Sequence, residues 1–169
     1  MNKVKMFFDY ACPFCLRGYE SLMELLPNYS NLEMEFHLCE ARPRPEEGYG
    51  YHSDLLIRAM FYAVNSGVEI SLFNKRAFEL YHEDEANVED INVLVKGFKD
   101  ILDADELKKM LISGKYEAEL QNANDYAYKQ SGVWIIPDFR AGSLKLAAEA
   151  GTDLSKEGIR DFLDKCAKL

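Results

Sequence analysis

The sequence predicts an α/β protein in which a βαβ unit and a ββα unit enclose a long helical segment. Residues 3–38 show an apolar run, a helical pattern and an alternating pattern, which is the order of a βαβ unit. Residues 53–131 then show helical periodicity. Residues 133–169 return to strand-like composition and end on an amphipathic helical pattern.

The first unit combines two strands with one intervening helix. Its first strand is the run 3–8, and Pro13 suits the first turn of the following helix, where its missing N–H costs little. The helix is marked by apolar residues at helical spacing and ends near Pro27: Leu16, Tyr19, Leu22, Met23, Leu25 and Leu26. The second strand is 32–38, where apolar and polar residues alternate. This connection predicts that the two strands are parallel.

The helical segment divides into five predicted helices. Ser53 is a candidate cap for the first, and apolar residues mark three helices over 55–63, 72–80 and 88–102. Asp103 and Glu106 have the spacing of a capping box, which predicts a short fourth helix. The fifth covers 116–127 and stops before Gly132, because glycine favours the position just after a helix.

The last unit is predicted to contain a hairpin and a helix. Residues 133–141 are strand-like but are interrupted by Pro137. Gly142 marks a hairpin turn, and 144–148 form the returning strand. Ser155 is a candidate cap for the final helix.

Composition narrows the partners and the compartment. The chain has 169 residues, is 48% hydrophobic and has a formal net charge of -9. This charge disfavours nucleic acid and anionic membrane surfaces as main partners. No apolar leader and no stretch long enough to span a membrane is found, so we expect a cytoplasmic protein. Four cysteines in a reducing cytosol do not predict structural disulfides.

The tetrapeptide Cys12-Pro13-Phe14-Cys15 is the strongest chemical signal in the chain. It lies between the first strand and the first helix, where unpaired backbone N–H groups favour a thiolate. In the cytosol a CxxC pair indicates redox chemistry or metal binding. A metal site needs two more ligands, and neither Cys39, Cys166 nor the histidines form a second tight pair. A redox pair is therefore favoured over a metal site and over an inert core dithiol.

The positions of the two cysteines suggest their roles. Cys12 stands at the helix start, exposed and electrostatically activated, so it is predicted to attack as a thiolate. Cys15 lies one turn deeper on the same side and is predicted to resolve the mixed disulfide. Pro13 and Phe14 are expected to tune the redox balance of the pair.

Several segments resemble a known family. They are Phe8-Asp9-Tyr10-Ala11-Cys12-Pro13-Phe14-Cys15 with Gly18, Glu40-Ala41-Arg42-Pro43, Phe78-Glu79-Leu80-Tyr81-His82 with 88–94, and Gly132-Val133-Trp134-Ile135-Ile136-Pro137. With these segments the chain resembles the DsbA-like branch of the thioredoxin superfamily. It is most similar to the FrnE-like group, whose relatives include 2-hydroxychromene-2-carboxylate isomerases and kappa-class glutathione transferases.

The resemblance implies a thioredoxin fold, βαβ…ββα, with an inserted all-helical domain. Residues 1–50 and 132–169 would form the thioredoxin-fold domain and 51–131 the insert. It also implies that the Ile136–Pro137 peptide bond is cis and that Ile136 faces the CxxC pair. From the residues alone, an ordinary trans proline opening an edge strand is the alternative.

Two features depart from better-known relatives. Many thioredoxin-fold proteins bury an acid six residues before the first cysteine, where this chain has Met6. Asp9 and Glu40 are the nearest candidates to assist Cys15, although capping or surface roles are favoured for both. Asp138 follows Pro137, and a charge beside the dithiol would raise the pKa of Cys12 or favour basic substrates.

Cys39 lies at the end of the second strand, at the sheet edge where α/β sites form. Cys39 is either a third reactive thiol near the site or a small buried residue without a chemical role. The second interpretation is favoured.

The predicted function is that of a thiol–disulfide oxidoreductase acting on protein or small-molecule disulfides. No cofactor is expected, with glutathione as candidate reductant or co-substrate. A glutathione-dependent isomerase or transferase and a redox-inactive binding module are the alternatives.

Overall fold

The computed structural model describes residues 1–149 and 153–169. Its core is a four-stranded sheet of order β2-β1-β3-β4. The strands are β1 (Asn2–Phe8), β2 (Leu32–Leu38), β3 (Asp138–Ala141) and β4 (Leu144–Ala147). As predicted, β1 and β2 are parallel, while β3 pairs antiparallel with both β1 and β4.

One face of the sheet packs against α1 (Pro13–Leu25) and α7 (Lys156–Cys166). The alternate residues Val4, Met6 and Phe8 of β1 are all buried in the main core. The Phe8 ring lies 6.1 Å from that of Tyr19 on α1. This packing fixes the helix that follows the CxxC pair against the strand that precedes it.

The opposite face is covered by the end of α6 (Glu117–Asp125) and the π-helical turn η3 (Tyr126–Gln130) that continues it. Here Phe7 and Cys39 pack with Ala127 and Val133 in a second, smaller cluster. Because strand side chains alternate, Phe7 faces away from Met6 and Phe8. The two faces therefore enclose different sets of candidate site residues.

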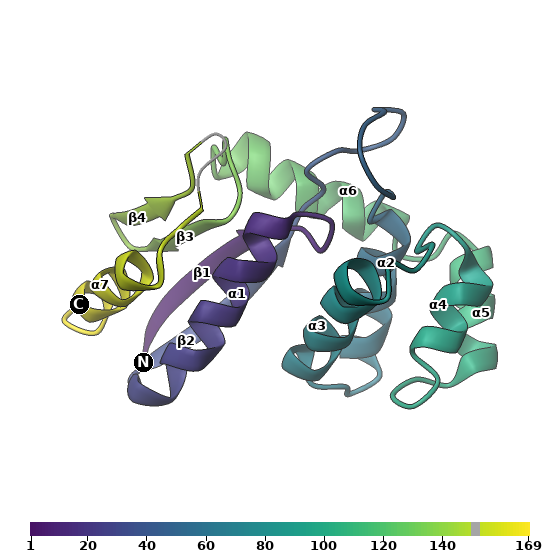
Figure 1. Cartoon of the computed structure of the whole chain (residues 1–169), viewed down its shortest axis with the longest axis horizontal. Helices are drawn as coiled ribbons and strands as arrows, with labels where there is room; N and C mark the ends of the chain where they lie inside the picture. Colours follow the sequence, from purple (N-terminus) through teal and green to yellow (C-terminus); the bar gives the residue numbers. More distant parts are fainter. Residues whose placement is uncertain (150–152) are drawn as a thin grey trace.

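The segment between β2 and β3 is helical, as predicted. It contains α2 (Asp54–Asn65), α3 (Ile70–Phe78), the π-helical turn η2 (Glu79–Glu83), α4 (Ile91–Gly97), α5 (Ala104–Ile112) and α6, while η1 (Leu26–Asn28) ends the first unit. Figure 1 shows α2 to α5 beside the sheet unit and α6 running back to it. The βαβ…ββα order with a helical insert is thus confirmed, whereas the domain bounds 51–131 stay a prediction.

Capping explains where several helices begin. Asp103 accepts a hydrogen bond from the backbone N–H of Glu106, and Ser155 from that of Gly158, as predicted. The predicted helix over 88–102 is shorter, because Asp90 caps it and α4 begins at Ile91. The hydroxyl of Ser53 does not cap α2.

The predicted strand over 133–141 forms only at 138–141. The residues before it are irregular, and the Ile136–Pro137 peptide bond within them is cis. Proline has no N–H to donate to a neighbouring strand, which agrees with a strand that starts after it. Gly142 has a φ of 57° and forms the predicted hairpin turn.

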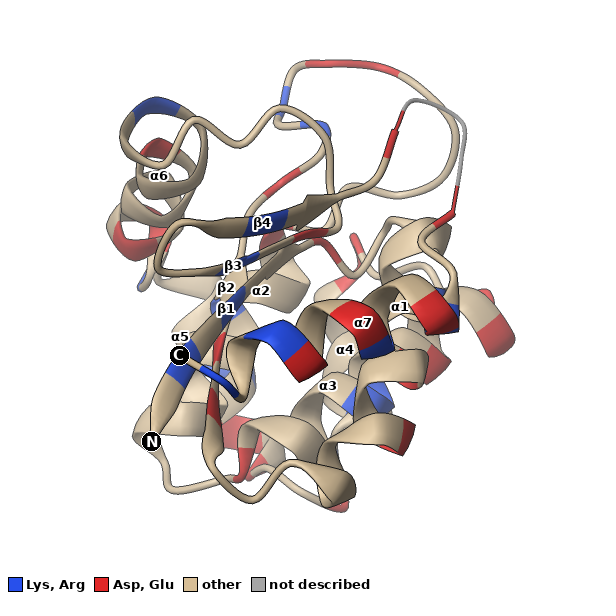
Figure 2. Cartoon of the chain, turned by 90° about the vertical axis from the view of Figure 1, so that its left-hand side faces the viewer, with Lys and Arg blue, Asp and Glu red and all other residues tan. Residues whose placement is uncertain are grey.

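Charge is distributed unevenly over these elements. Figure 2 shows acidic positions on α1 and α6, charges of both signs on α7, and a basic position on β4. Within the described ranges, no helix is both long and apolar enough to cross a membrane.

Candidate functional site

The CxxC pair lies at the first turn of α1, as the sequence predicts. Cys12 is the N-cap, with extended backbone angles, and Pro13 follows at the first helical position. The backbone N–H of Cys15 donates to Sγ of Cys12 over 3.2 Å. Cys12 thus occupies the place of a capping serine or aspartate, and its sulfur receives a helix N–H that would otherwise lack a partner.

This geometry lowers the pKa of Cys12 below its ordinary value. The largest cause is the hydrogen bond from the Cys15 side chain, and the backbone N–H groups of Cys15 and Phe14 add to it. Partial burial and the charge of Asp9 oppose the shift. Cys12 is half-buried rather than exposed, so the predicted exposure was wrong, while the predicted activation agrees with the lowered pKa.

Cys15 is fully buried, and burial raises its pKa well above the ordinary value. The neighbouring Cys12 raises it further. The pKa values of the two thiols therefore move in opposite directions. These shifts favour the thiolate at the half-buried Cys12 and the protonated thiol at the buried Cys15.

The late proline and its neighbours shape the site from the side of the sheet. Gly18 lies one turn after Cys15, and a Cβ there would stand 3.3 Å from Cγ of Pro137. Ile136 is partly buried and packs against both core clusters. The late proline thus lies directly against the helix that carries the CxxC pair. Pro13 is exposed, and Arg17 lies 5.1 Å from the centroid of the Phe14 ring.

Asp9 is buried, which rules out the surface role expected for it but agrees with the capping role, since its carboxylate accepts backbone N–H groups. Its Oδ1 accepts from the N–H of Ala11 and its Oδ2 from that of Ala41, at 3.1 and 2.7 Å. Burial raises the pKa of Asp9, although these hydrogen bonds partly offset it. Its charge acts on both CxxC thiols, whereas Met6 is entirely within the core.

Glu40 is also buried, contrary to the surface expectation. Its backbone N–H donates to Oδ1 of Asn124, and Nδ2 of Asn124 donates to its Oε2. The hydroxyl of Tyr128 donates to its carbonyl oxygen. Burial raises the pKa of Glu40, with the Asn124 bond opposing the shift. This set joins the end of β2 to α6 and η3.

Cys39 lies in the second cluster with Phe7, on the other face of the sheet from the α1 packing. It is fully buried, and burial raises its pKa to about 12. These features agree with the interpretation of a small buried residue rather than a third reactive thiol.

Asp138 is buried on β3 and is paired with two cations. Nε and Nη2 of Arg140 donate to its two oxygens at 2.9 and 3.0 Å, and Nζ of Lys145 lies 3.5 Å away. Arg140 also lies over the Phe7 ring at 5.6 Å, which places the pair on the second face. The structure therefore gives Asp138 a neutralised, structural environment rather than a free charge beside the dithiol.

Sequence reasoning missed the residues that attach the insert to the CxxC loop. The Tyr10 hydroxyl donates to Oδ1 of Asn74 over 2.6 Å, and Nε2 of His82 lies 2.7 Å from the Tyr10 carbonyl oxygen. Both partners lie far along the chain from Tyr10, so no local spacing could indicate the contacts. For Asp138, the alternation on β3 could have indicated Arg140, because residues two apart share a face.

Across residues 1–149 and 153–169 there is no group of three or more His, Cys, Asp or Glu side chains that could hold an ion. All four cysteines are free thiols.

Comparisons with known proteins show the fold. No protein-family model matches the chain. A curated relative, the uncharacterized protein YwbO of Bacillus subtilis strain 168, is 24% identical to this chain. The match covers 94% of this chain and 96% of the relative.

Similar solved structures include oxidoreductases of the DsbA and thioredoxin type. A probable DsbA oxidoreductase of Streptomyces coelicolor has a TM-score of 0.78 and 15% identity, covering 99% of this chain and 89% of its own. The cytosolic disulfide reductase DsbM of Pseudomonas aeruginosa, with GSH, has a TM-score of 0.72 and 12% identity. This match covers 99% of this chain and 100% of the DsbM chain. A thioredoxin-like oxidoreductase of Silicibacter pomeroyi has a TM-score of 0.72 and 20% identity, covering 99% and 87%. The chain therefore has the DsbA-like thioredoxin fold.

Proposed function

We propose that the protein is a thiol–disulfide oxidoreductase that uses Cys12 as nucleophile and Cys15 as resolving thiol. The observation that carries this proposal is the opposite shift of the two pKa values at one helix N-terminus. A half-buried thiolate beside a buried, protonated thiol is the arrangement that a two-step exchange requires. The fold shared with DsbA-like oxidoreductases supports it.

In the reducing direction the exchange has two steps. The Cys12 thiolate attacks one sulfur of a substrate disulfide, the substrate S–S bond breaks, and the departing substrate thiolate takes up a proton. Cys15 then loses its proton and attacks Sγ of Cys12, which breaks the mixed disulfide and releases the second substrate thiolate. The substrate gains two electrons, and Cys12 and Cys15 become a disulfide. The oxidising direction is the reverse.

Asp9 is our candidate to receive the proton of Cys15. Its charge acts on both cysteines, and its raised pKa brings it closer to that of a group able to take a proton near neutral pH. Met6 occupies the position where many relatives have an acid, so Asp9 would serve that role from the loop after β1. Glu40 has its side-chain oxygen bonded to Asn124, which favours a structural role for it.

The substrate class we propose is protein or small-molecule disulfides in the cytoplasm, with glutathione as the thiol that reduces the oxidised pair. The DsbM structure, a cytosolic disulfide reductase determined with GSH, supports both assignments by analogy of fold. The direction of exchange depends on the reduction potential, which spans about -270 to -120 mV among such proteins.

The test is a single-turnover reaction between the reduced protein and a peptide that contains one disulfide. We expect stoichiometric reduction by the unmodified protein and none by Cys12→Ser. Cys15→Ser should accumulate a mixed disulfide at Cys12, which mass spectrometry of the proteolysed adduct locates. Attachment at another cysteine, or full reduction by Cys12→Ser, would overturn the assignment. A reduced protein that does not reduce the peptide, together with an oxidised protein that does not oxidise the dithiol form of the same peptide, would favour a binding module.

A further inference from the structure

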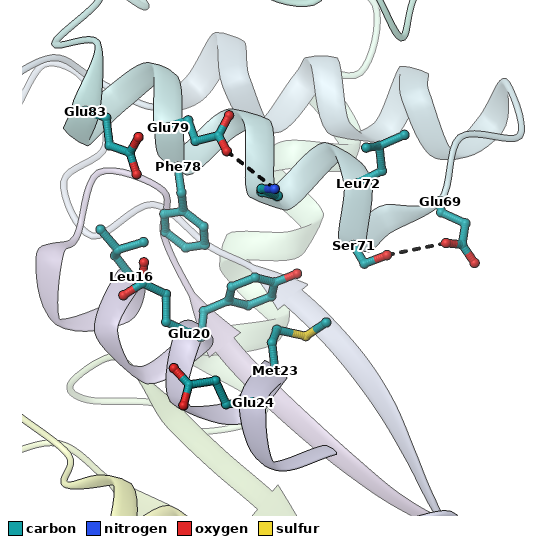
Figure 3. Close-up of a pocket in the computed structure, with 12 residues that line it drawn as sticks. Leu16, Glu20, Met23, Glu24, Glu69, Ser71, Leu72, Phe78, Glu79 and Glu83 are labelled. Carbon is teal, nitrogen blue, oxygen red and sulfur yellow. Dashed lines mark hydrogen bonds and ion pairs between the residues drawn. The ribbon is translucent and has the colours of Figure 1, made fainter. Parts of the chain in front are cut away.

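A groove of about 810 Å³ lies between α1 and the helical insert. Its apolar lining comes from both sides, with Leu16, Tyr19 and Met23 on α1 and Leu72 and Phe78 on α3. Figure 3 shows these two sides facing each other. Leu72 is 49% exposed, so the groove presents apolar surface that no part of the described chain covers. Such a surface on a charged protein indicates a binding site.

The groove runs along the helix that carries the dithiol. Leu16, which lines it, directly follows Cys15 in α1. From Leu16 to Glu24 the helix rises about 12 Å, which is about two turns. Leu16 also stands four residues after Cys12, so the two lie on the same side of α1, and a polypeptide whose cysteine is bonded to Cys12 can continue toward this groove.

The rim of the groove is strongly acidic. Five of its lining residues are glutamates, two on α1 and three on the insert, whereas one is a lysine: Glu20, Glu24, Glu69, Glu79, Glu83 and Lys75. Glu24 pairs with Lys156, and Glu79 lies near Lys75 and Arg76. Glu20 and Glu83 are exposed and form no salt bridge within the described ranges.

Charge complementarity selects the occupant. A second copy of this chain, with a net charge of -9, would be repelled, and glutathione has a net negative charge at neutral pH. A segment that is apolar on one side and carries Lys or Arg on the other matches both the lining and the rim. Resting on the function proposed above, we propose that the groove binds a basic amphipathic segment of the polypeptide whose cysteine reacts with Cys12.

The experiment measures binding without the redox reaction. A short cysteine-free synthetic peptide of Leu and Lys at helical spacing is labelled with a fluorophore, and its anisotropy is followed on titration with the full-length Cys12→Ser/Cys15→Ser protein. The counterpart peptide has Glu in place of every Lys. We expect the basic peptide to bind at least about tenfold more tightly than the acidic one, a ratio equal to about 1.4 kcal/mol.

Two charge-reversal variants distinguish groove binding from general attraction to an acidic protein. In the same background, Glu20→Lys/Glu83→Lys should weaken binding of the basic peptide about tenfold. The matched control, Glu33→Lys/Glu119→Lys, makes the same charge change at exposed positions on β2 and α6 and should bind as the parent does. Leu72→Ser should weaken both peptides through the lost apolar contact.

Equal binding of the two peptides, equal losses in both charge variants, or no binding at all would each overturn the proposal. Because the peptides and the protein variant lack the reacting cysteines, this result is independent of redox activity. If the protein binds the basic peptide but does not exchange disulfides, the groove proposal stands and the proposed function fails. If the protein exchanges disulfides but binds both peptides equally, the proposed function stands and the groove proposal fails.

Discussion

The backbone N–H of Cys15 lies 3.2 Å from Sγ of Cys12, across the first turn of α1. This contact makes one cysteine the cap of the helix that buries the other. The same turn therefore sets the pKa of both thiols, lowering that of Cys12 and, through burial, raising that of Cys15. The lowered pKa of Cys12 therefore follows from the position of the pair in the helix, and the charge of Asp9 opposes it.

Removing the Cys15 side chain should raise the pKa of Cys12. The side-chain hydrogen bond from Cys15 is the largest cause of the lowered value, so in Cys15→Ala the pKa should move toward the ordinary 9.0. The pH dependence of the iodoacetamide alkylation rate at Cys12 measures it, since only the thiolate reacts. Cys15→Ser retains an O–H donor and should lie closer to the unmodified protein. An unchanged pKa in Cys15→Ala would contradict this account.

Native alkylation should modify Cys12 alone. Cys15, Cys39 and Cys166 are fully buried, and burial raises the pKa of each. Mass spectrometry after brief treatment at mildly alkaline pH should find one label per chain, whereas four should appear in denaturant. Comparable native labelling at Cys39 would reopen its role as a third reactive thiol.

Stability should depend on pH through Glu40. Burial raises its pKa above 4.5, so the folded state binds this proton more tightly than the unfolded state does. Its favourable contribution is present below pH 4.5 and is lost as pH rises through the folded-state pKa. The Glu40→Gln variant keeps a neutral side chain at every pH. Its free energy of unfolding, relative to that of the unmodified protein, should therefore be larger at neutral pH than at pH 4.5. Urea titrations at the two pH values measure this difference, and a constant gap would contradict it.

Removing Arg140 should destabilise the fold. Asp138 is fully buried, and Arg140→Ala leaves its charge with only Lys145 nearby. We expect a loss of about 2–4 kcal/mol in the free energy of unfolding. Lys145→Ala, which removes the half-exposed partner, should cost less than about 1 kcal/mol. Equal losses of free energy of unfolding in the two variants would show that the bidentate Arg140 pair stabilises the fold no more than Lys145 does.

Periodicity and capping residues were sufficient to predict the arrangement of elements. The alternation over 32–38 and the helical spacing after Pro13 are local patterns, and they predicted the bounds of β2 and the start of α1, which ends at Leu25 rather than near Pro27. Asp103 and Ser155 likewise act on backbone groups three residues away. Local physics is visible in a single sequence because both partners are close in the chain.

The carboxylates could not be placed in this way. Carboxylates such as Asp9 and Glu40 usually lie on the surface. Asp9 is instead bonded to Ala41, 32 residues away, and Glu40 to Asn124, 84 residues away. Asp138 was expected beside the dithiol because Pro137 is. The alternation of side chains along the strand instead turns it to the opposite face, toward Arg140.

The most direct test of the central claim is a redox titration of Cys12 and Cys15 in buffers of reduced and oxidised glutathione. The fraction of disulfide is read by mass after thiol trapping. We predict one reversible two-electron transition, with a potential between about -270 and -120 mV, that is absent from Cys12→Ser. A pair that stays reduced in glutathione disulfide, or an equal transition in Cys12→Ser, would contradict the account.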